Sequence, residues 1–125
     1  MARFFKSILF LSLILLSSCQ EGGEAGDLLG QWRMVDSDTK YVSFSGSLTL
    51  FRSITEGEVY GTFQHVGDSL FIQCVSIYGA PSDTAIVENS FGFQPFCDIR
   101  LKIDALSNDK IVLSKDQRQW RFRKY

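Results

Sequence analysis

The sequence predicts an all-β fold, a small antiparallel up-and-down barrel of about eight strands. Three observations favour it. After residue 27 no window keeps an apolar stripe of helical period, whereas apolar and polar residues alternate repeatedly. Turn-forming residues separate these segments at short intervals, as consecutive hairpins require. Finally, 45% hydrophobic and 22% charged residues in a chain of 125 suit one folded domain. A β-sandwich is the main alternative.

The clearest strand covers residues 97–104, where Cys97, Ile99, Leu101 and Ile103 alternate with charged residues. Such a segment has one buried and one solvated face. In chain order, strands are expected at residues 30–35, 41–52, 59–64, 69–77, 84–88, 97–104, 110–114 and 118–124. The strand at 84–88 has the weakest pattern, and a loop at 89–95 follows it.

Residues 41–52 form one long predicted strand with Gly46 as a bulge or bend inside it. On that register Val42, Phe44, Leu48 and Leu50 share one face. Ten bulky side chains are expected to point into the barrel, namely Trp32, Phe44, Leu48, Leu50, Phe63, Leu70, Ile72, Leu101, Trp120 and Phe122.

The interior of an eight-stranded barrel either encloses one small ligand or is filled by side chains. The ten inward groups favour a filled core, and an open apolar cavity is the alternative. Tyr60, Tyr78, Phe91 and Phe93 lie near turns. They either line the mouth of a cavity or cover one end of the barrel. A cavity below about 300 Å³ would exclude the small apolar ligand.

The first 18 residues are predicted to be a signal peptide. Arg3 and Lys6 precede an apolar run at residues 7–16. That run is too short for a transmembrane helix, which needs about 20 apolar residues.

The run closes as Leu16-Ser17-Ser18-Cys19, which resembles the bacterial lipobox. The resemblance implies a diacylglycerol group on the Cys19 sulfur and a fatty acyl chain on the new amino terminus. Two or more chains anchor a protein stably in a membrane. An ordinary secreted protein is the alternative. Gln20 follows the cysteine, without the aspartate that often retains lipoproteins in an inner membrane, so the outer membrane is expected. Its periplasmic and surface faces both stay open.

The expected domain organisation is therefore a signal peptide at 1–18, a lipidated cysteine with an acidic flexible tether at 19–27, and a barrel at 28–125. The formal net charge of −1 gives no support for a nucleic-acid partner.

The opening Leu28-Leu29-Gly30-Gln31-Trp32 resembles the Leu-x-Gly-x-Trp motif of lipocalin-like domains. The resemblance implies that Gly30 and Trp32 close one end of the barrel, and that Arg121 or Arg123 stacks over the tryptophan. The order of elements over residues 28–125 is similar to the lipocalin-like lipoproteins of Bacteroidota, many of them of unknown function.

Cys74 and Cys97 are an even pair whose parity places both inward. They form either a disulfide closing about 24 residues or two buried thiols. A strand between theirs would set the sulfurs too far apart. Ser69 and Thr84 stand in Asp-Ser/Thr-apolar triplets that resemble the O-glycosylation acceptor of Bacteroidota.

No catalytic, metal or cofactor site is expected, because the single histidine, His65, has no nucleophile motif or paired ligand beside it. The sequence thus predicts an envelope lipoprotein that binds a small apolar ligand or a partner protein. The alternative is a structural accessory subunit with a filled barrel, and an enzyme is less favoured.

Overall fold

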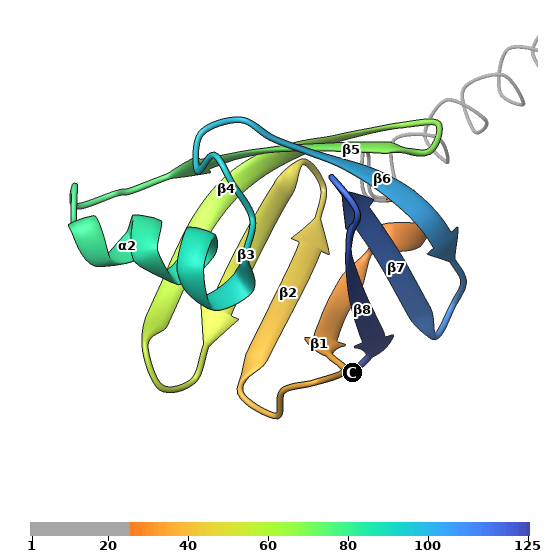
Figure 1. The fold of residues 1–125 in the computed structure, drawn as a ribbon, viewed down its shortest axis with the longest axis horizontal. Coiled ribbons are helices and arrows are strands. Elements are labelled where there is room, and N and C mark those ends of the chain that lie inside the picture. Colours follow the sequence, from red (N-terminus) through yellow and green to blue (C-terminus); the bar gives the residue numbers. More distant parts are fainter. Residues whose placement is uncertain (1–25) are drawn as a thin grey trace, which may run out of the picture.

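In the computed structural model, which describes residues 26–125, eight strands follow one another around a closed antiparallel barrel (Figure 1). The elements are η1 (Gly26–Leu28), β1 (Gly30–Met34), β2 (Lys40–Ser45), β3 (Leu48–Ser53), β4 (Gly57–Val66), β5 (Ser69–Val75), α2 (Pro81–Ala85), η2 (Ile86–Phe91), β6 (Ile99–Leu106), β7 (Lys110–Lys115) and β8 (Arg118–Lys124). The predicted signal peptide, Cys19 and the tether as far as residue 25 lie outside the described residues. Gly26 and Asp27 belong to η1.

Each strand pairs with the next one along the chain, and β1 pairs with β8 to close the barrel. The predicted up-and-down barrel is therefore confirmed. Closure leaves none of these strands with an unpaired edge, which is the usual liability of an open sheet. Among residues 26–125, no helix has the length and apolar character needed to span a bilayer.

The single strand predicted at 41–52 is wrong, because it is a hairpin of β2 and β3. Ser45 pairs with Leu48 across a two-residue turn, and Gly46 takes a φ of 60° there. Glycine adopts that left-handed conformation without a steric penalty. The turn reverses the parity that follows it, so Thr49 and Phe51 face the core. Leu48, 56% exposed, points outward, and Leu50 is only half-buried, so both inward assignments were wrong.

The strand predicted at 84–88 is also wrong, since the chain forms the helical segment α2–η2 there and β5 pairs directly with β6. Pro81 occupies the first turn of α2, where its missing N–H costs no hydrogen bond. Gly92, at a φ of 87°, ends η2. This segment lies beside β4 (Figure 1). Eight strands remain because the split of 41–52 supplies the missing one.

Eight of the ten predicted inward side chains are buried, all but Leu48 and Leu50. Side chains from β3 and from the β5–β6 connection complete the core. Those missing from the prediction include Phe51, Phe91 and Phe93, which are among the largest fully buried groups.

Thr49 is one of two buried polar side chains among the described residues, together with Ser53. It is 1% exposed, and its hydroxyl has no hydrogen-bond partner in the described part of the chain. A buried unpaired hydroxyl costs roughly 1–3 kcal/mol. Thr49→Val keeps the shape and removes that group, so we expect the free energy of unfolding in urea to rise by about 1 kcal/mol. Thr62→Val, at an exposed site on β4, is the control and should change it by less than about 0.5 kcal/mol. Equal changes would contradict the assignment.

Candidate functional site

Two aromatic side chains from the β5–β6 connection fill the barrel. We call Phe91 and Phe93 the aromatic plug. Each is 1% exposed, and the Phe93 ring centroid lies 4.8 Å from that of Trp120. The Phe91 ring meets Phe51 edge-on at 5.3 Å. The two plug residues therefore do not line a ligand mouth. They take the alternative role of filling and covering the barrel.

The interior holds a cavity of only about 10 Å³. Its walls are wholly apolar and come from both sides of the barrel, together with the plug: Trp32, Val42, Phe44, Ile72, Phe93, Ile111, Leu113 and Phe122. Pockets that hold small molecules measure about 300–1,000 Å³. The interior is thus far too small for the small apolar ligand, and the filled core is confirmed.

Side chains of the β7–β8 hairpin donate hydrogen bonds to backbone carbonyls in the segment that carries the plug. The indole N–H of Trp120 donates to the carbonyl of Phe91 at 2.8 Å, inside the core. The Arg118 guanidinium lies over the Trp120 ring at 4.9 Å and donates to the carbonyl of Gly92 at 3.5 Å. Lys115 donates to the carbonyl of Gln94. The buried carbonyl of Phe91 is therefore paired, as buried polar groups usually are, and two further carbonyls of the segment that carries the plug are paired as well.

Trp32 of the Leu-x-Gly-x-Trp motif packs at one end of the barrel and closes it. Its indole N–H donates to the carbonyl of Leu28 at 2.8 Å. The cation over its ring is Lys124, with Nζ 4.5 Å from the centroid. Arg121 and Arg123, the two predicted stacking partners, instead point outward and are exposed. Lys124 takes this role because β1 and β8 pair Trp32 with Lys124.

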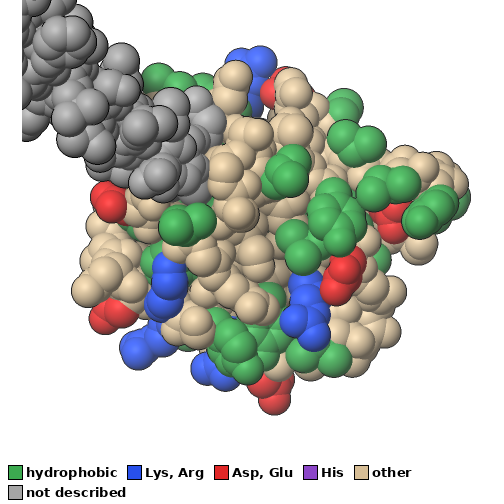
Figure 2. Space-filling model, turned by 180° about the vertical axis from the view of Figure 1, so that it is seen from behind, with side chains coloured by type: hydrophobic (Ala, Val, Ile, Leu, Met, Phe, Trp, Pro, Cys, Tyr) green, Lys and Arg blue, Asp and Glu red, His purple; other side chains and the backbone are tan. Residues whose placement is uncertain are grey.

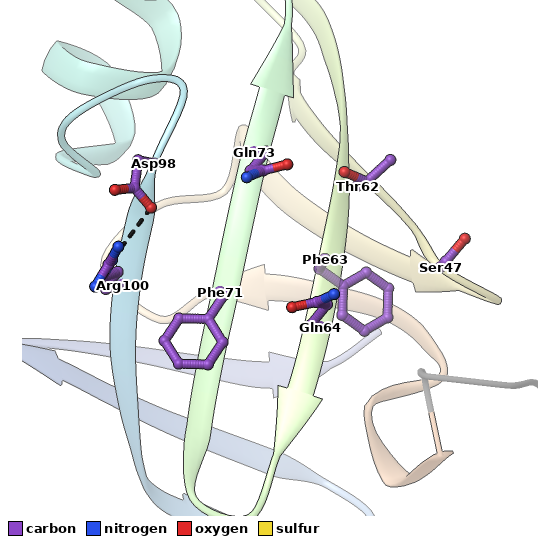
Figure 3. A pocket seen from close by; sticks show the side chains of 8 residues that line it. All are labelled: Ser47, Thr62, Phe63, Gln64, Phe71, Gln73, Asp98 and Arg100. Carbon is purple, nitrogen blue, oxygen red and sulfur yellow. Dashed lines mark hydrogen bonds and ion pairs between the residues drawn. The ribbon is translucent and has the colours of Figure 1, made fainter.

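A groove of about 560 Å³ runs over the outer wall of β4–β6 (Figure 3). Its lining mixes amide, hydroxyl, charged and aromatic groups: Ser47, Thr62, Phe63, Gln64, Phe71, Gln73, Asp98 and Arg100. Asp98 and Arg100 form an ion pair of 3.2 Å at its edge. Their charges offset each other, so the groove has no strong preference for a cation or an anion.

Exposed apolar side chains continue the groove onto β3. The register places Leu50, Tyr60 and Val75 in one row across β3, β4 and β5, and Leu48 pairs with Thr62. We call this row, with Leu48 and the groove, the outer β3–β6 face. Tyr60 is 45% and Val75 56% exposed. Figure 2 shows hydrophobic side chains on the side of the molecule that carries the β5–α2 connection, with charged groups among them.

The other predicted residues fall at scattered positions. Tyr78 is 92% exposed in the β5–α2 connection and lines neither the interior nor the groove. Ser69 begins β5 and Thr84 lies in α2, each half-buried. Their glycosylation stays a prediction. Within residues 26–125 no group of three or more His, Cys, Asp or Glu side chains is arranged to hold a metal ion.

Sequence reasoning missed the groove because polar residues are common at outward strand positions, so Gln64, Gln73 and Arg100 carry no distinguishing pattern. One signal was present. Phe71 is a large aromatic residue at an outward position of β5, between two buried neighbours.

The comparisons with known proteins agree with this barrel. A family model described as a lipocalin-like domain matches residues 14–125. A lipocalin-like protein from Bacteroides uniformis is 20% identical with a TM-score of 0.64, over 80% of this chain and 100% of that one. An uncharacterized protein from Bacteroides eggerthii is 19% identical with a TM-score of 0.61, over 78% and 98%. Identity this low indicates a shared fold alone. No match was found among curated proteins.

Proposed function

Since the chain belongs to the lipocalin-like domain family, we propose that it is an envelope binding protein that uses its outer wall to bind a partner protein. One contrast carries the proposal. The interior offers about 10 Å³, whereas the outer groove offers about 560 Å³. We therefore assign binding to the outer β3–β6 face and not to the inside of the barrel. A barrel filled by its own side chains also suits an accessory subunit of an envelope complex.

The chemistry of the outer β3–β6 face supports a protein as the occupant. Interface centres are enriched in aromatic residues and arginine, and their rims are polar. This face offers Tyr60 and Phe71 beside exposed Val75, and the strand register places Gln64 and Arg100 on either side of Phe71. A groove open to solvent suits a convex protein segment better than a small molecule that must be enclosed.

The location belongs to the same proposal. The lipobox at Cys19 supports a lipid anchor, and the outer membrane is the proposed destination. Because Gly26 and Asp27 belong to η1, the tether that remains is residues 19–25, which reaches at most about 25 Å when fully extended. The barrel would therefore stay close to the bilayer, and its partner would be a protein at that membrane.

Site-specific photo-crosslinking in intact cells tests the proposal. A photoreactive amino acid replaces Gln73 in the groove, or Gln119 on β8 as the matched control, since both glutamines are exposed. We expect one envelope protein to crosslink at position 73 and not at 119. Tyr60→Ala should weaken the isolated complex by roughly tenfold or more, because central aromatic residues carry much of the binding energy.

An equal crosslink at both positions would contradict the assigned face, and so would the absence of any crosslink at position 73. Circular dichroism of Tyr60→Ala should match the parent, because an exposed side chain contributes little to folding.

A further inference from the structure

Cys74 and Cys97 meet where β5 ends and β6 begins. Cys74 is buried on β5, and Cys97 is exposed in the turn before β6, because β6 starts only at Ile99. The prediction that Cys97 faces inward is therefore wrong. Both cysteines are free thiols in the structure.

The strand register brings the two backbones together. Ile72 and Ile99 are the last residues paired in this register, and Cys74 and Cys97 lie just beyond that pair, Cys74 two residues after Ile72 and Cys97 two residues before Ile99. The Cys74 N–H donates to the carbonyl of Phe96 at 3.1 Å, which places Cys74 against the residue that precedes Cys97. Facing residues in antiparallel strands have Cα atoms about 4.5–5.5 Å apart. Cys97 directly follows Phe96, so it lies close to the roughly 4.4–6.8 Å from Cys74 that a disulfide spans. No strand lies between them, which removes the objection raised by the expected strand at 84–88.

We propose that Cys74 and Cys97 are a covalent modification site, forming an intrachain disulfide by exchange with an oxidised dithiol carrier of the envelope. The bond closes a loop that contains α2, η2 and both residues of the aromatic plug. It therefore clamps the β5–β6 connection at its two ends and holds the plug in the barrel. This inference rests on the envelope location proposed above, but it is independent of the partner proposed for the outer β3–β6 face.

The difference in exposure sets the order of attack. The Cys97 thiolate reaches the carrier first, bonds to one carrier sulfur and displaces the other as a thiolate. The Cys74 sulfur then attacks Cys97, loses its proton to solvent and releases the second carrier thiolate. Two thiols are oxidised and the carrier disulfide is reduced to a dithiol.

The electrostatics of the pair agree with that order. Burial, and secondly the neighbouring Cys97 thiolate, raise the pKa of the Cys74 thiol to about 12. Cys74 therefore stays a protonated thiol and does not start the exchange. Once the Cys97 sulfur is bound to the carrier, its negative charge is gone. The contribution of the Cys97 thiolate to the raised pKa of Cys74 is then removed.

The test uses the full chain with Cys19→Ser, which leaves only these two cysteines, and oxidised glutathione as the probe. We expect a product lighter by two hydrogen atoms that retains no glutathione. The added Cys74→Ser change should instead trap one glutathione on Cys97, whereas Cys97→Ser should leave the protein unmodified. Oxidation should raise the midpoint of thermal unfolding by roughly 10 °C, reversibly with dithiothreitol.

A two-cysteine chain that keeps glutathione on Cys97, or whose thiols both still alkylate after treatment, overturns the proposal. If Cys74→Ser does not fold, Cys74→Ala replaces it, and the mass of the two-cysteine chain decides without either. The double serine variant is the thermal control, and its midpoint should not respond to dithiothreitol.

Discussion

Phe93→Ala is expected to lower the free energy of unfolding by about 4 kcal/mol, the largest effect of any substitution considered for this barrel. Phe93 is 1% exposed, and its ring packs between Trp120 and Phe51, with centroids 4.8 Å and 5.6 Å away. Truncation removes these contacts and leaves a cavity that the closed barrel has little freedom to fill. Urea denaturation followed by circular dichroism measures the loss.

Benzene supplies a second readout of the same cavity. An apolar cavity of this kind stays dry and binds a small aromatic molecule. Benzene should therefore raise the unfolding midpoint of Phe93→Ala, because a ligand that binds only the folded state stabilises it. The parent, with about 10 Å³ inside, should not respond. If Phe93→Ala does not fold, Phe93→Leu gives a smaller loss in the same direction.

Tyr78→Ala is the matched control, since Tyr78 is an aromatic residue that is 92% exposed. Its loss should stay within about 0.5 kcal/mol. Similar losses for Phe93 and Tyr78 would mean that the plug does not pack the barrel.

The barrel could be predicted because strand alternation and short hairpins are local properties. Gly46 marks the limit of that reasoning. A glycine between two alternating segments is compatible with a bend, which keeps the parity, and with a two-residue turn, which reverses it. The pairing of Ser45 with Leu48 selects the turn. Leu48 and Leu50 then lie on the opposite face from the one that the pattern indicated.

The helical segment α2–η2 could not be predicted for a different reason. Residues 84–88 combine β-branched and small side chains, which suit a strand or a helix. The helix is favoured by interactions of residues far from this segment in the sequence. These are the direct pairing of β5 with β6 and the hydrogen bond from Trp120 to Phe91. Pro81 was the available local signal, because proline favours the first turn of a helix. Trp32, by contrast, could be placed from a short motif. Only the cation over its ring differs from the prediction, since it is Lys124.

Gly61→Ala is expected to cost about 2 kcal/mol although it adds one methyl group. A Cβ at Gly61 would lie 2.7 Å from the carbonyl oxygen of Gln73 and 3.1 Å from the Cα of Cys74. Both are backbone atoms of the paired strand β5, so no side chain can rotate away. The strands must separate, at a cost of roughly 3 kcal/mol for overpacking. Alanine also lowers the conformational entropy of the unfolded chain, which stabilises the folded state by less than about 1 kcal/mol. The net effect is therefore a lower free energy of unfolding.

Thr62→Ala is the control for this change, because Thr62 is the next residue on β4 and points outward. Its unfolding free energy in urea should stay within about 0.5 kcal/mol of the parent. Gln73 lies in the groove, so strand separation at Gly61 should also weaken crosslinking from position 73. A Gly61→Ala protein as stable as the parent would show that β4 and β5 move apart without cost, and the close approach would then have no role in shaping the outer β3–β6 face.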